Sequence, residues 1–397
     1  MAPNSTSKLG DYFSSSREKG YEGLPLMSVT LNDGLVFRDS LDRKTDTNLD
    51  PNEHLIIKPG YIAYNMMRVW QGALGRAAAD GLVSPAYVVI KPNEKIDSLY
   101  AEYLFKSARM IYLFWAFSYG LTRDRLRLYY NDFARIPVVL LPLPEQKKIA
   151  QILSTWDKAI ATTEQLLANS QQQKKALMQK LLTGKKRLLD ENGVRFSGEW
   201  SSVTVRQMGK VVTGGTPDTQ NSEYWDGELA WVTPTDITKL RSRFVSKTSR
   251  TITDLGVRNS SATILPSGSL LVCTRATVGE SAISSTRIST NQGFKNLVPS
   301  DSYDVNFLYY LFKQNVHEIV RRACGSTFLE ISKKDFEQIS MICPEKKEQK
   351  RIAAALALSD ERITSLQTKL SLLSREKKAL VQQLLTGKRR VKVDEVV

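Results

Sequence analysis

The sequence holds few of the residues that build disulfides, metal sites or catalytic triads. Its 397 residues include three cysteines, Cys273, Cys324 and Cys343, and only two histidines, His54 and His317. The cysteines are odd in number and far apart, so they predict neither a disulfide framework nor a CxxC metal site. A zinc site or a Ser-His-Asp triad would need a histidine, and neither histidine has a suitable neighbour pattern. We therefore expect a reducing, cytoplasmic location and no metal bound by this chain.

Long apolar stretches are also missing. No run approaches the roughly 18 residues of a membrane-spanning helix, and the first residues lack the apolar stretch of a signal peptide. The hydrophobic fraction of 42% and the charged fraction of 24% are ordinary for globular protein, which excludes wholesale disorder. The length favours two to three domains, each large enough to bury its own core.

Acidic residues are in deficit. The chain has 56 Lys and Arg against 41 Asp and Glu, a net charge of +15, which favours a polyanionic partner such as nucleic acid or an acidic membrane surface. Residues 145–187 and 345–390 carry about +6 and +7 of this charge, and the rest of the chain is close to neutral. In the rest of the chain the net charge gives no guide to nucleic-acid contacts, so candidates there must come from local clusters of basic residues.

One segment of the chain occurs twice, 203 residues apart. The run Glu-Gln-Lys-Lys-Ile-Ala at 145–150 returns as Glu-Gln-Lys-Arg-Ile-Ala at 348–353, and almost half of the positions in 145–187 are identical in 348–390. The flanking parts repeat more weakly, with Tyr-Leu-Phe-Lys at both 103–106 and 310–313. Self-similarity at so long a period indicates an internal duplication.

Each copy of the duplicated segment carries an apolar stripe of helical period. Stripe residues recur alternately four and three positions apart for about five heptads, which is typical of a coiled coil. The apolar positions that we assign to its seam are Ile149, Leu153, Trp156, Ile160, Leu167, Leu177, Leu181, Ile352, Leu356, Ile363, Leu366, Leu370, Leu380 and Leu384. At about 1.5 Å per residue each helix is roughly 55 Å long, and Gly184 and Gly387 supply left-handed caps. The two helices most simply pair with each other, although each could instead pack on its neighbouring domain.

The remaining segments have a β-rich pattern, with short β-branched runs, turn residues between them and a helix-like stretch after them. We therefore predict an α+β fold in which two mixed α/β domains are separated by two long helices that form an antiparallel coiled coil, with a pseudo-two-fold internal repeat. The expected boundaries are 1–142 for the first domain, 143–187 for the first helix, 188–343 for the second domain, 344–390 for the second helix and 391–397 for a tail.

The most specific motif is the duplicated pair of segments that run from Glu-Gln-Lys-(Lys/Arg)-Ile-Ala to Leu-Leu-Thr-Gly-Lys. The second half adds Gly214–Pro217 (Gly-Gly-Thr-Pro) and Tyr224–Asp236, which includes Trp-Val-Thr-Pro-x-Asp. Together these segments resemble the DNA-specificity (S) subunits of type I restriction–modification systems. The resemblance extends over essentially the whole chain. The first half has Gly23–Thr30 in the corresponding place but lacks the Gly-Gly-Thr-Pro motif.

The resemblance implies two target-recognition domains, each of which reads one half of a split site in double-stranded DNA while the antiparallel helices set the distance between them. It also implies two modification (methyltransferase) subunits docked against the helices, and restriction subunits that translocate and cleave DNA. S-adenosylmethionine, ATP and Mg are then expected on those partners, with no cofactor and no catalytic residue in this chain. The absence of a glycine-rich nucleotide-binding or S-adenosylmethionine-binding loop in the sequence agrees with this implication.

Candidate DNA contacts are basic, amide and hydroxyl residues of the two predicted domains. Arg and Lys bind phosphate or guanine, and Asn and Gln pair with adenine through two hydrogen bonds. The candidates are Arg68, Arg123, Arg125, Arg127, Thr216, Arg275, Asn291, Gln292, Lys333 and Lys334. The alternative for each is a surface residue that serves only solubility or a local turn.

Two other kinds of function remain open. A single-chain DNA nuclease or methyltransferase is one, because 145–147 and 345–347 have the Glu-x-Lys spacing found in metal-dependent nucleases. Both lie at the start of a predicted helix, with no second carboxylate on an adjoining strand to complete a metal site. A coiled-coil scaffold with protein- or carbohydrate-binding heads is the other, and the heptads alone are compatible with it.

Overall fold

The computed structural model describes residues 7–41, 49–122, 126–275, 277–323 and 330–393. The chain divides into two compact units: unit 1 comprises residues 1–162 and 370–397, and unit 2 comprises residues 163–369. Each unit therefore contains one globular domain together with parts of both long helices. Within the described ranges, no helix combines the length and the apolar character that crossing a membrane requires.

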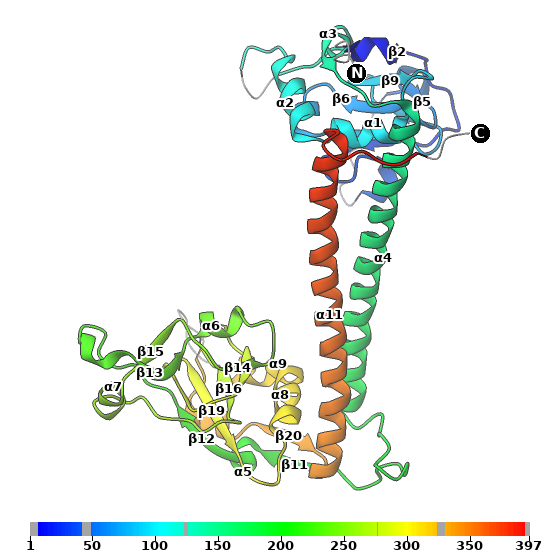
Figure 1. The fold of residues 1–397 in the computed structure, drawn as a ribbon. Helices are drawn as coiled ribbons and strands as arrows, with labels where there is room; N and C mark the ends of the chain where they lie inside the picture. The colour runs from blue at the N-terminus through cyan, green and yellow to red at the C-terminus, as the bar shows by residue number, and fades with distance from the viewer. Residues whose placement is uncertain (1–6, 42–48, 123–125, 276, 324–329, 394–397) are drawn as a thin grey trace. The chain divides into compact units, whose positions relative to one another are not determined.

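Unit 1 is built on an antiparallel four-stranded sheet in the order β2-β9-β6-β7, of which Figure 1 labels β2, β9 and β6. The strand pairs β1-β10, β3-β4 and β5-β8 accompany this sheet. Its strands are β1 (Ser7–Lys8), β2 (Phe13–Ser16), β3 (Met27–Val29), β4 (Leu35–Phe37), β5 (Leu55–Ile57), β6 (Ile62–Asn65), β7 (Leu74–Arg76), β8 (Gly81–Val83), β9 (Tyr87–Pro92) and β10 (Pro137–Val138). Its short helices are α1 (Ser98–Phe105), α2 (Ala108–Ala116) and α3 (Tyr130–Arg135).

The core of unit 1 is centred on one aromatic ring of α3. Phe133 is fully buried, and the ring centroids of Phe13, Tyr64, Phe105 and Phe114 lie 5.5–6.2 Å from its own. The first turns of the first long helix and the last turns of the second belong to the same apolar cluster. Both long helices are therefore part of this hydrophobic core.

Unit 2 has a larger sheet system. Five strands follow the order β12-β19-β16-β17-β14, beside a three-stranded sheet β15-β13-β18 and the pair β11-β20. Its strands are β11 (Ser201–Thr204), β12 (Gly209–Thr213), β13 (Trp225–Val232), β14 (Phe244–Val245), β15 (Arg250–Ile252), β16 (Leu270–Cys273), β17 (Ser281–Ser284), β18 (Ile288–Thr290), β19 (Phe294–Pro299) and β20 (Ser340–Cys343). Its short helices are α5 (Val205–Met208), α6 (Pro234–Thr238), α7 (Asp254–Arg258), α8 (Val305–Gln314), α9 (Val316–Arg322) and α10 (Lys333–Glu337).

The main sheets of the two units share one strand order. The order β2-β9-β6-β7 in unit 1 matches β12-β19-β16-β17 in unit 2, and the pair β1-β10 matches β11-β20. The registers also match, since Ile62 of β6 pairs with Ile90 in the same way that Leu270 of β16 pairs with Leu297. The predicted α+β fold with an internal repeat is confirmed.

The long helices α4 (Leu143–Leu181) and α11 (Lys346–Leu385) run antiparallel to each other. In unit 1 the end of α11 lies against the start of α4, and in unit 2 the end of α4 lies against the start of α11. Every position of the two heptad stripes is buried or half-buried, whereas all other residues between 161 and 176 are exposed. The stripes therefore form the seam between the helices, in addition to the contacts that the helix ends make with the domains.

Candidate nucleic-acid interface

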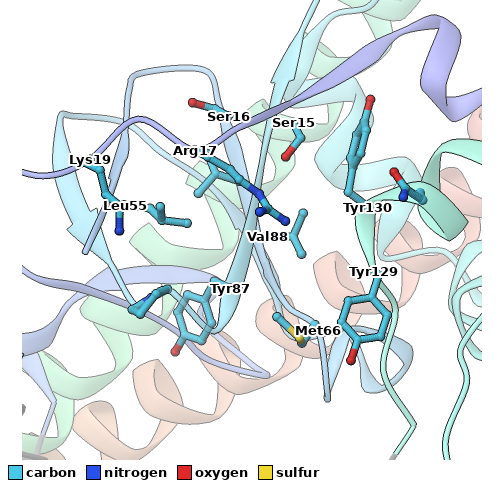
Figure 2. A pocket seen from close by; sticks show the side chains of 13 residues that line it. Ser15, Ser16, Arg17, Lys19, Leu55, Met66, Tyr87, Val88, Tyr129 and Tyr130 are labelled. Carbon is cyan, nitrogen blue, oxygen red and sulfur yellow. The ribbon is translucent and has the colours of Figure 1, made fainter. Parts of the chain in front are cut away.

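Unit 1 has a pocket of about 650 Å³ formed by loops that are distant in the sequence. Arg17 and Lys19 follow β2, Tyr87 begins β9, and Tyr129 and Asn131 lie at the start of α3. Figure 2 shows the Arg17 side chain extending across the pocket, among serine hydroxyls, tyrosine rings and apolar side chains. Two cations and several aromatic rings in one open hollow suit a nucleic-acid strand, because cations attract phosphates and rings stack on bases.

The turn after β6 joins this pocket to a second basic segment. The backbone carbonyl of Met66, which lines the pocket, accepts a 2.9 Å hydrogen bond from the amide of Leu128. Arg127 is exposed, and its guanidinium donates to the Tyr129 hydroxyl at 3.4 Å. Arg68 is exposed two residues beyond Met66. The turn and the 126–129 segment thus extend the basic surface beyond the pocket.

The sequence candidates in unit 1 have different outcomes. Arg68 and Arg127 lie on exposed loops beside the pocket, whereas Arg123 and Arg125 lie outside the described residues. No residue that lines the pocket was a sequence candidate, including the cations Arg17 and Lys19 and the polar residues Tyr87 and Asn131. None of them belongs to a motif, and only the strand pairing brings their loops together.

In unit 2 the Gly-Gly-Thr-Pro motif lies against the loop between β18 and β19. The amide of Gly215 donates to the Thr290 carbonyl at 2.9 Å, and the Thr216 hydroxyl donates to the side-chain carbonyl of Gln292. A Cβ on Gly214 would lie 1.9 Å from the carbonyl oxygen of Asn291, so only glycine permits this approach. The motif therefore supports an exposed amide side chain, that of Gln292.

Arg275 lies beside the same loop. The neighbouring Thr274 amide donates to the Gly293 carbonyl at 2.8 Å, and a Cβ on Gly293 would lie 3.6 Å from the Cβ of Arg275. The Asn291 side chain accepts from the Gly293 amide at 3.0 Å, which fixes its orientation. Thus the structure brings together four predicted residues, Thr216, Arg275, Asn291 and Gln292.

Lys333 and Lys334 begin α10, close in sequence to a strand bridge between Arg275 and Glu330. Both lysines are exposed, and Lys333 lies 3.7 Å from Glu337 on its own helix. An exposed pair of this kind is screened by water and leaves the ammonium group available for other contacts. The two lysines occupy the place that Tyr130 and Asn131 have at the start of α3 in unit 1.

An arginine that was not a candidate also lies on the surface of unit 2. The guanidinium carbon of Arg250 lies 3.5 Å from the ring centroid of Trp225 and 5.9 Å from that of Trp231. Stacking on the rings holds the guanidinium plane in one orientation while its edge keeps hydrogen-bond donors. Arg250 is exposed, so those donors face solvent.

The Trp-Val-Thr-Pro-x-Asp motif shapes the turn behind these loops. Trp231 is buried, and its indole N–H donates to the Gly215 carbonyl at 2.9 Å. The Asp236 carboxylate accepts from the amide and hydroxyl of Thr233 and from the Ser249 amide. Burial favours a raised pKa for Asp236, but these hydrogen bonds outweigh it and lower the pKa below its ordinary value. The motif residues therefore stabilise the loops, and Gln292 and Arg250 lie on the surface that they support.

Strand register corrects one sequence alignment. Ser16 of β2 pairs with Val89, and Val212 of β12 pairs in the same way with Asn296. Ser16 in unit 1 is therefore equivalent to Val212 in unit 2. The structural counterpart of Gly214–Pro217 is therefore residues 18–21 rather than Gly23–Thr30. Because the loops differ in length, the offset between the copies is 196 residues here but 203 in the helices, so a comparison at one offset misplaces the first loop.

Metal-binding and thiol chemistry have little support in the described parts of the chain. No three His, Cys, Asp or Glu side chains gather there as a metal site would require. Burial raises the pKa of both Cys273 and Cys343 to about 12, so these thiols keep their protons at neutral pH.

The chain is similar in sequence to known proteins. Residues 6–169 and 197–375 match the family described as "Type I restriction modification DNA specificity domain". The type I restriction enzyme MjaIX specificity subunit of Methanocaldococcus jannaschii is 35% identical over 167 residues, which cover 42% of this chain and 39% of that protein. The EcoR124I/EcoR124II specificity subunit of Escherichia coli is 26% identical over 247 residues, 59% of this chain and 58% of that protein. Each of these alignments spans less than two thirds of the relative.

A solved structure extends the likeness to the fold of the whole chain. The crystal structure of the type I restriction–modification system S subunit from M. genitalium aligns with a TM-score of 0.57 and 14% identity, over 96% of both chains. At this identity the alignment supports the fold alone, whereas the two family matches cover both globular domains. The chain therefore belongs to the family of DNA specificity subunits of type I restriction–modification systems.

Proposed function

We propose that this chain reads a two-part DNA target, one half with the loops of unit 1 and the other with the loops of unit 2. The observation that carries the proposal is that corresponding loops of the duplicated scaffold form one surface in each unit. Each surface combines the loop after the first sheet strand, the turn after β6 or β16, the loop before β9 or β19, and the start of α3 or α10. A duplicated scaffold with two different loop surfaces suits two short base sequences separated by bases that are not read.

We further propose that α4 and α11 form the spacer that sets the unread gap, and that they dock two methyltransferase subunits and the restriction subunits. In this proposal the partners carry S-adenosylmethionine, ATP and Mg, and this chain carries no cofactor and no catalytic residue. Because the proposed ligand is duplex DNA, the cytoplasm is the expected compartment.

The decisive experiment is selection of binding sequences from random duplex oligonucleotides, using the full chain with its cognate methyltransferase subunit. The expected result is a motif of two short parts with a gap of fixed length. A single uninterrupted motif would contradict the division between units, and the absence of any preference would favour a scaffold with protein- or carbohydrate-binding heads.

A second assay separates DNA reading from catalysis. The purified chain alone, supplied with Mg²⁺ or with S-adenosylmethionine, is expected to leave plasmid DNA uncut and unmethylated. Cutting or methyl transfer by the chain alone would favour the single-chain nuclease or methyltransferase. A preparation that contains the methyltransferase subunit is the positive control for methylation.

A further inference from the structure

Each long helix carries one lysine in its heptad stripe. Lys174 of α4 and Lys377 of α11 are the charged residues at equivalent stripe positions, and their side chains are only 22% and 23% exposed. A lysine in an apolar seam is unfavourable unless it is paired, since a cation loses hydration when it is buried. Polar residues at such positions commonly select one register of a coiled coil at some cost in stability.

In unit 2 the lysine has a partner on the opposite helix and a third group from the domain. Lys174 Nζ lies 2.5 Å from Asp360 Oδ1 of α11, and the Tyr310 hydroxyl of α8 donates to Asp360 Oδ2 at 2.5 Å. The ammonium also lies 5.6 Å from the centre of the Tyr310 ring. One carboxylate thus joins α11, α4 and α8.

Unit 1 repeats this arrangement with the helices exchanged. Lys377 Nζ of α11 pairs with Asp157 Oδ1 of α4, and the Tyr103 hydroxyl of α1 donates to Asp157 Oδ2 at 2.5 Å. Burial, together with the hydrogen bond to the carboxylate, raises the pKa of Tyr103 well above its ordinary value, so the phenol remains a donor. The same causes, in the same order, raise the pKa of Tyr310.

The pairs are specific to one helix register. Sliding α11 by one heptad along α4 would place either Ala353 or Gln367 opposite Lys174, because antiparallel helices exchange partners seven residues at a time. Neither residue carries a negative charge, so Lys174 loses its partner in both directions. Such a slip would displace the helices by about 10 Å, the length of about three base pairs.

We propose that the triads Lys174–Asp360–Tyr310 and Lys377–Asp157–Tyr103 are positioning residues that fix the gap length of the DNA target. Each triad holds the helix that follows the main sheet of its domain, α1 or α8, to one place on the paired helices. Loosening a triad lets the reading loops shift along the spacer, so that targets with the wrong gap become acceptable. This inference rests on the proposed two-part recognition.

The test compares binding to two duplexes that differ only in the gap. One carries the motif selected by the wild-type chain, and the other has three base pairs added between its halves, the change in gap that matches a slip of one heptad. In the Asp157→Asn, Asp360→Asn double variant, the preference for the native gap should fall about tenfold, the effect of losing roughly 1.4 kcal/mol of charged hydrogen bonding. Affinity for a duplex with a single half-site should change little, because the loops are untouched.

Controls separate a positioning role from general damage. Glu361→Gln alters an exposed acid next to Asp360 and should keep the wild-type gap preference. Lys174→Asp should relax the preference, and adding Asp360→Lys should restore part of it by reversing the ion pair. If the asparagine variant does not fold, the Tyr103→Phe, Tyr310→Phe variant removes only the domain's hydrogen bonds and should still relax the preference, about threefold.

The outcomes distinguish this inference from the proposed function. A folded variant that keeps the full gap preference overturns the role of the triads while leaving two-part recognition intact. A wild-type chain that selects no split motif overturns the proposed function, and this inference with it. A loss of single-site affinity that equals the loss on the native target would mean that the triads act on the loops themselves, which also contradicts a spacing role.

Discussion

The two units have the same scaffold but different loop surfaces. The strand order, the buried phenylalanine of α3 or α10 and the Lys–Asp–Tyr triad recur in both. At the loops, unit 1 has a pocket with Arg17, Lys19 and tyrosine rings, whereas unit 2 has Gln292 supported by the Gly-Gly-Thr-Pro turn. The packing that holds a domain on the helices is therefore repeated, while the surface available to a ligand is not.

The helix ends differ in a related way. In unit 2, Arg187 forms a bidentate pair with the fully buried carboxylate of Glu348, and the Trp200 indole N–H donates to the same carboxylate at 3.2 Å. In unit 1, Arg390 forms the equivalent pair with Glu145, but its side chain is 60% exposed. Removing one partner of a buried pair leaves an unpaired charge, whereas water screens an exposed pair, so loss of Arg187 should destabilise the protein more than loss of Arg390.

Exchanging the first domain should have the largest effect, and it tests whether the two units act independently. Replacing residues 1–140 with those of a relative should change one half of the selected motif completely and leave the other half unaltered, because each half is assigned to one set of loops. Selection from random oligonucleotides measures both halves at once. Changes in both halves would mean that the two surfaces do not read independently.

Truncating the equivalent core phenylalanines, Phe133 and Phe336, tests whether the two cores contribute equally to the free energy of unfolding. Phe133→Ala should destabilise unit 1 by about 3–5 kcal/mol, because a fully buried ring is replaced by a cavity. Phe336→Ala should cost unit 2 about 3 kcal/mol, near the lower end of that range, since Phe336 has one described ring neighbour, Phe312, at 5.8 Å.

Hydrogen exchange resolved by unit measures the two effects separately. Each substitution should raise exchange mainly in its own unit, with little change in the strands of the other. An equal rise in both units after either substitution would mean that they unfold as a single cooperative body.

Single substitutions on the loops sharpen the difference between the loop surfaces. Gln292→Ala should cost about 1–3 kcal/mol of binding and relax the preference at one position, in the half read by unit 2 only. Lys19→Ala should weaken binding to all sequences alike and reduce the salt dependence by about one phosphate contact. Binding titrations at several salt concentrations distinguish these results, and a sequence-specific effect of Lys19→Ala would assign it to base reading.

The smallest expected effect concerns Asp236 and pH. Its pKa is lowered in the folded protein, so its contribution to the free energy of unfolding is present above the unfolded value of 3.8 and is lost as the pH falls through the lower folded value. Asp236→Asn should therefore be less stable than the wild type at pH 6, and the difference should shrink at pH 3. Urea unfolding at both values checks the sign, and a difference that grows at pH 3 would contradict it.

Sequence could predict the helices well because their pattern is local. The heptads, the paired glycines and the duplicated Lys-Lys-Ala-Leu run each lie within one short segment, and the fold of α4 and α11 follows from them. The partners of Lys174 and Lys377 could not be predicted in this way, since each ion pair joins residues about 200 positions apart and depends on the helix register.

The sequence identified more of the loop surface in unit 2 than in unit 1. Thr216 belongs to the Gly-Gly-Thr-Pro motif, and the fold places it beside the candidates Asn291 and Gln292. Arg17 and Lys19 lie in a loop without a motif, and the offset between the copies differs from loop to loop. Only the paired strands, which fix where each loop emerges, could reveal their pocket.

The division of unit 1 along the chain has a consequence for biosynthesis. Residues 163–369 form unit 2 without interruption, whereas the core of unit 1 includes Leu384 and Leu385 near the end of the chain. During synthesis, the apolar core of unit 1 is complete only after Leu384 and Leu385 have been added. The second half should therefore mature ahead of the first, against the usual order of translation.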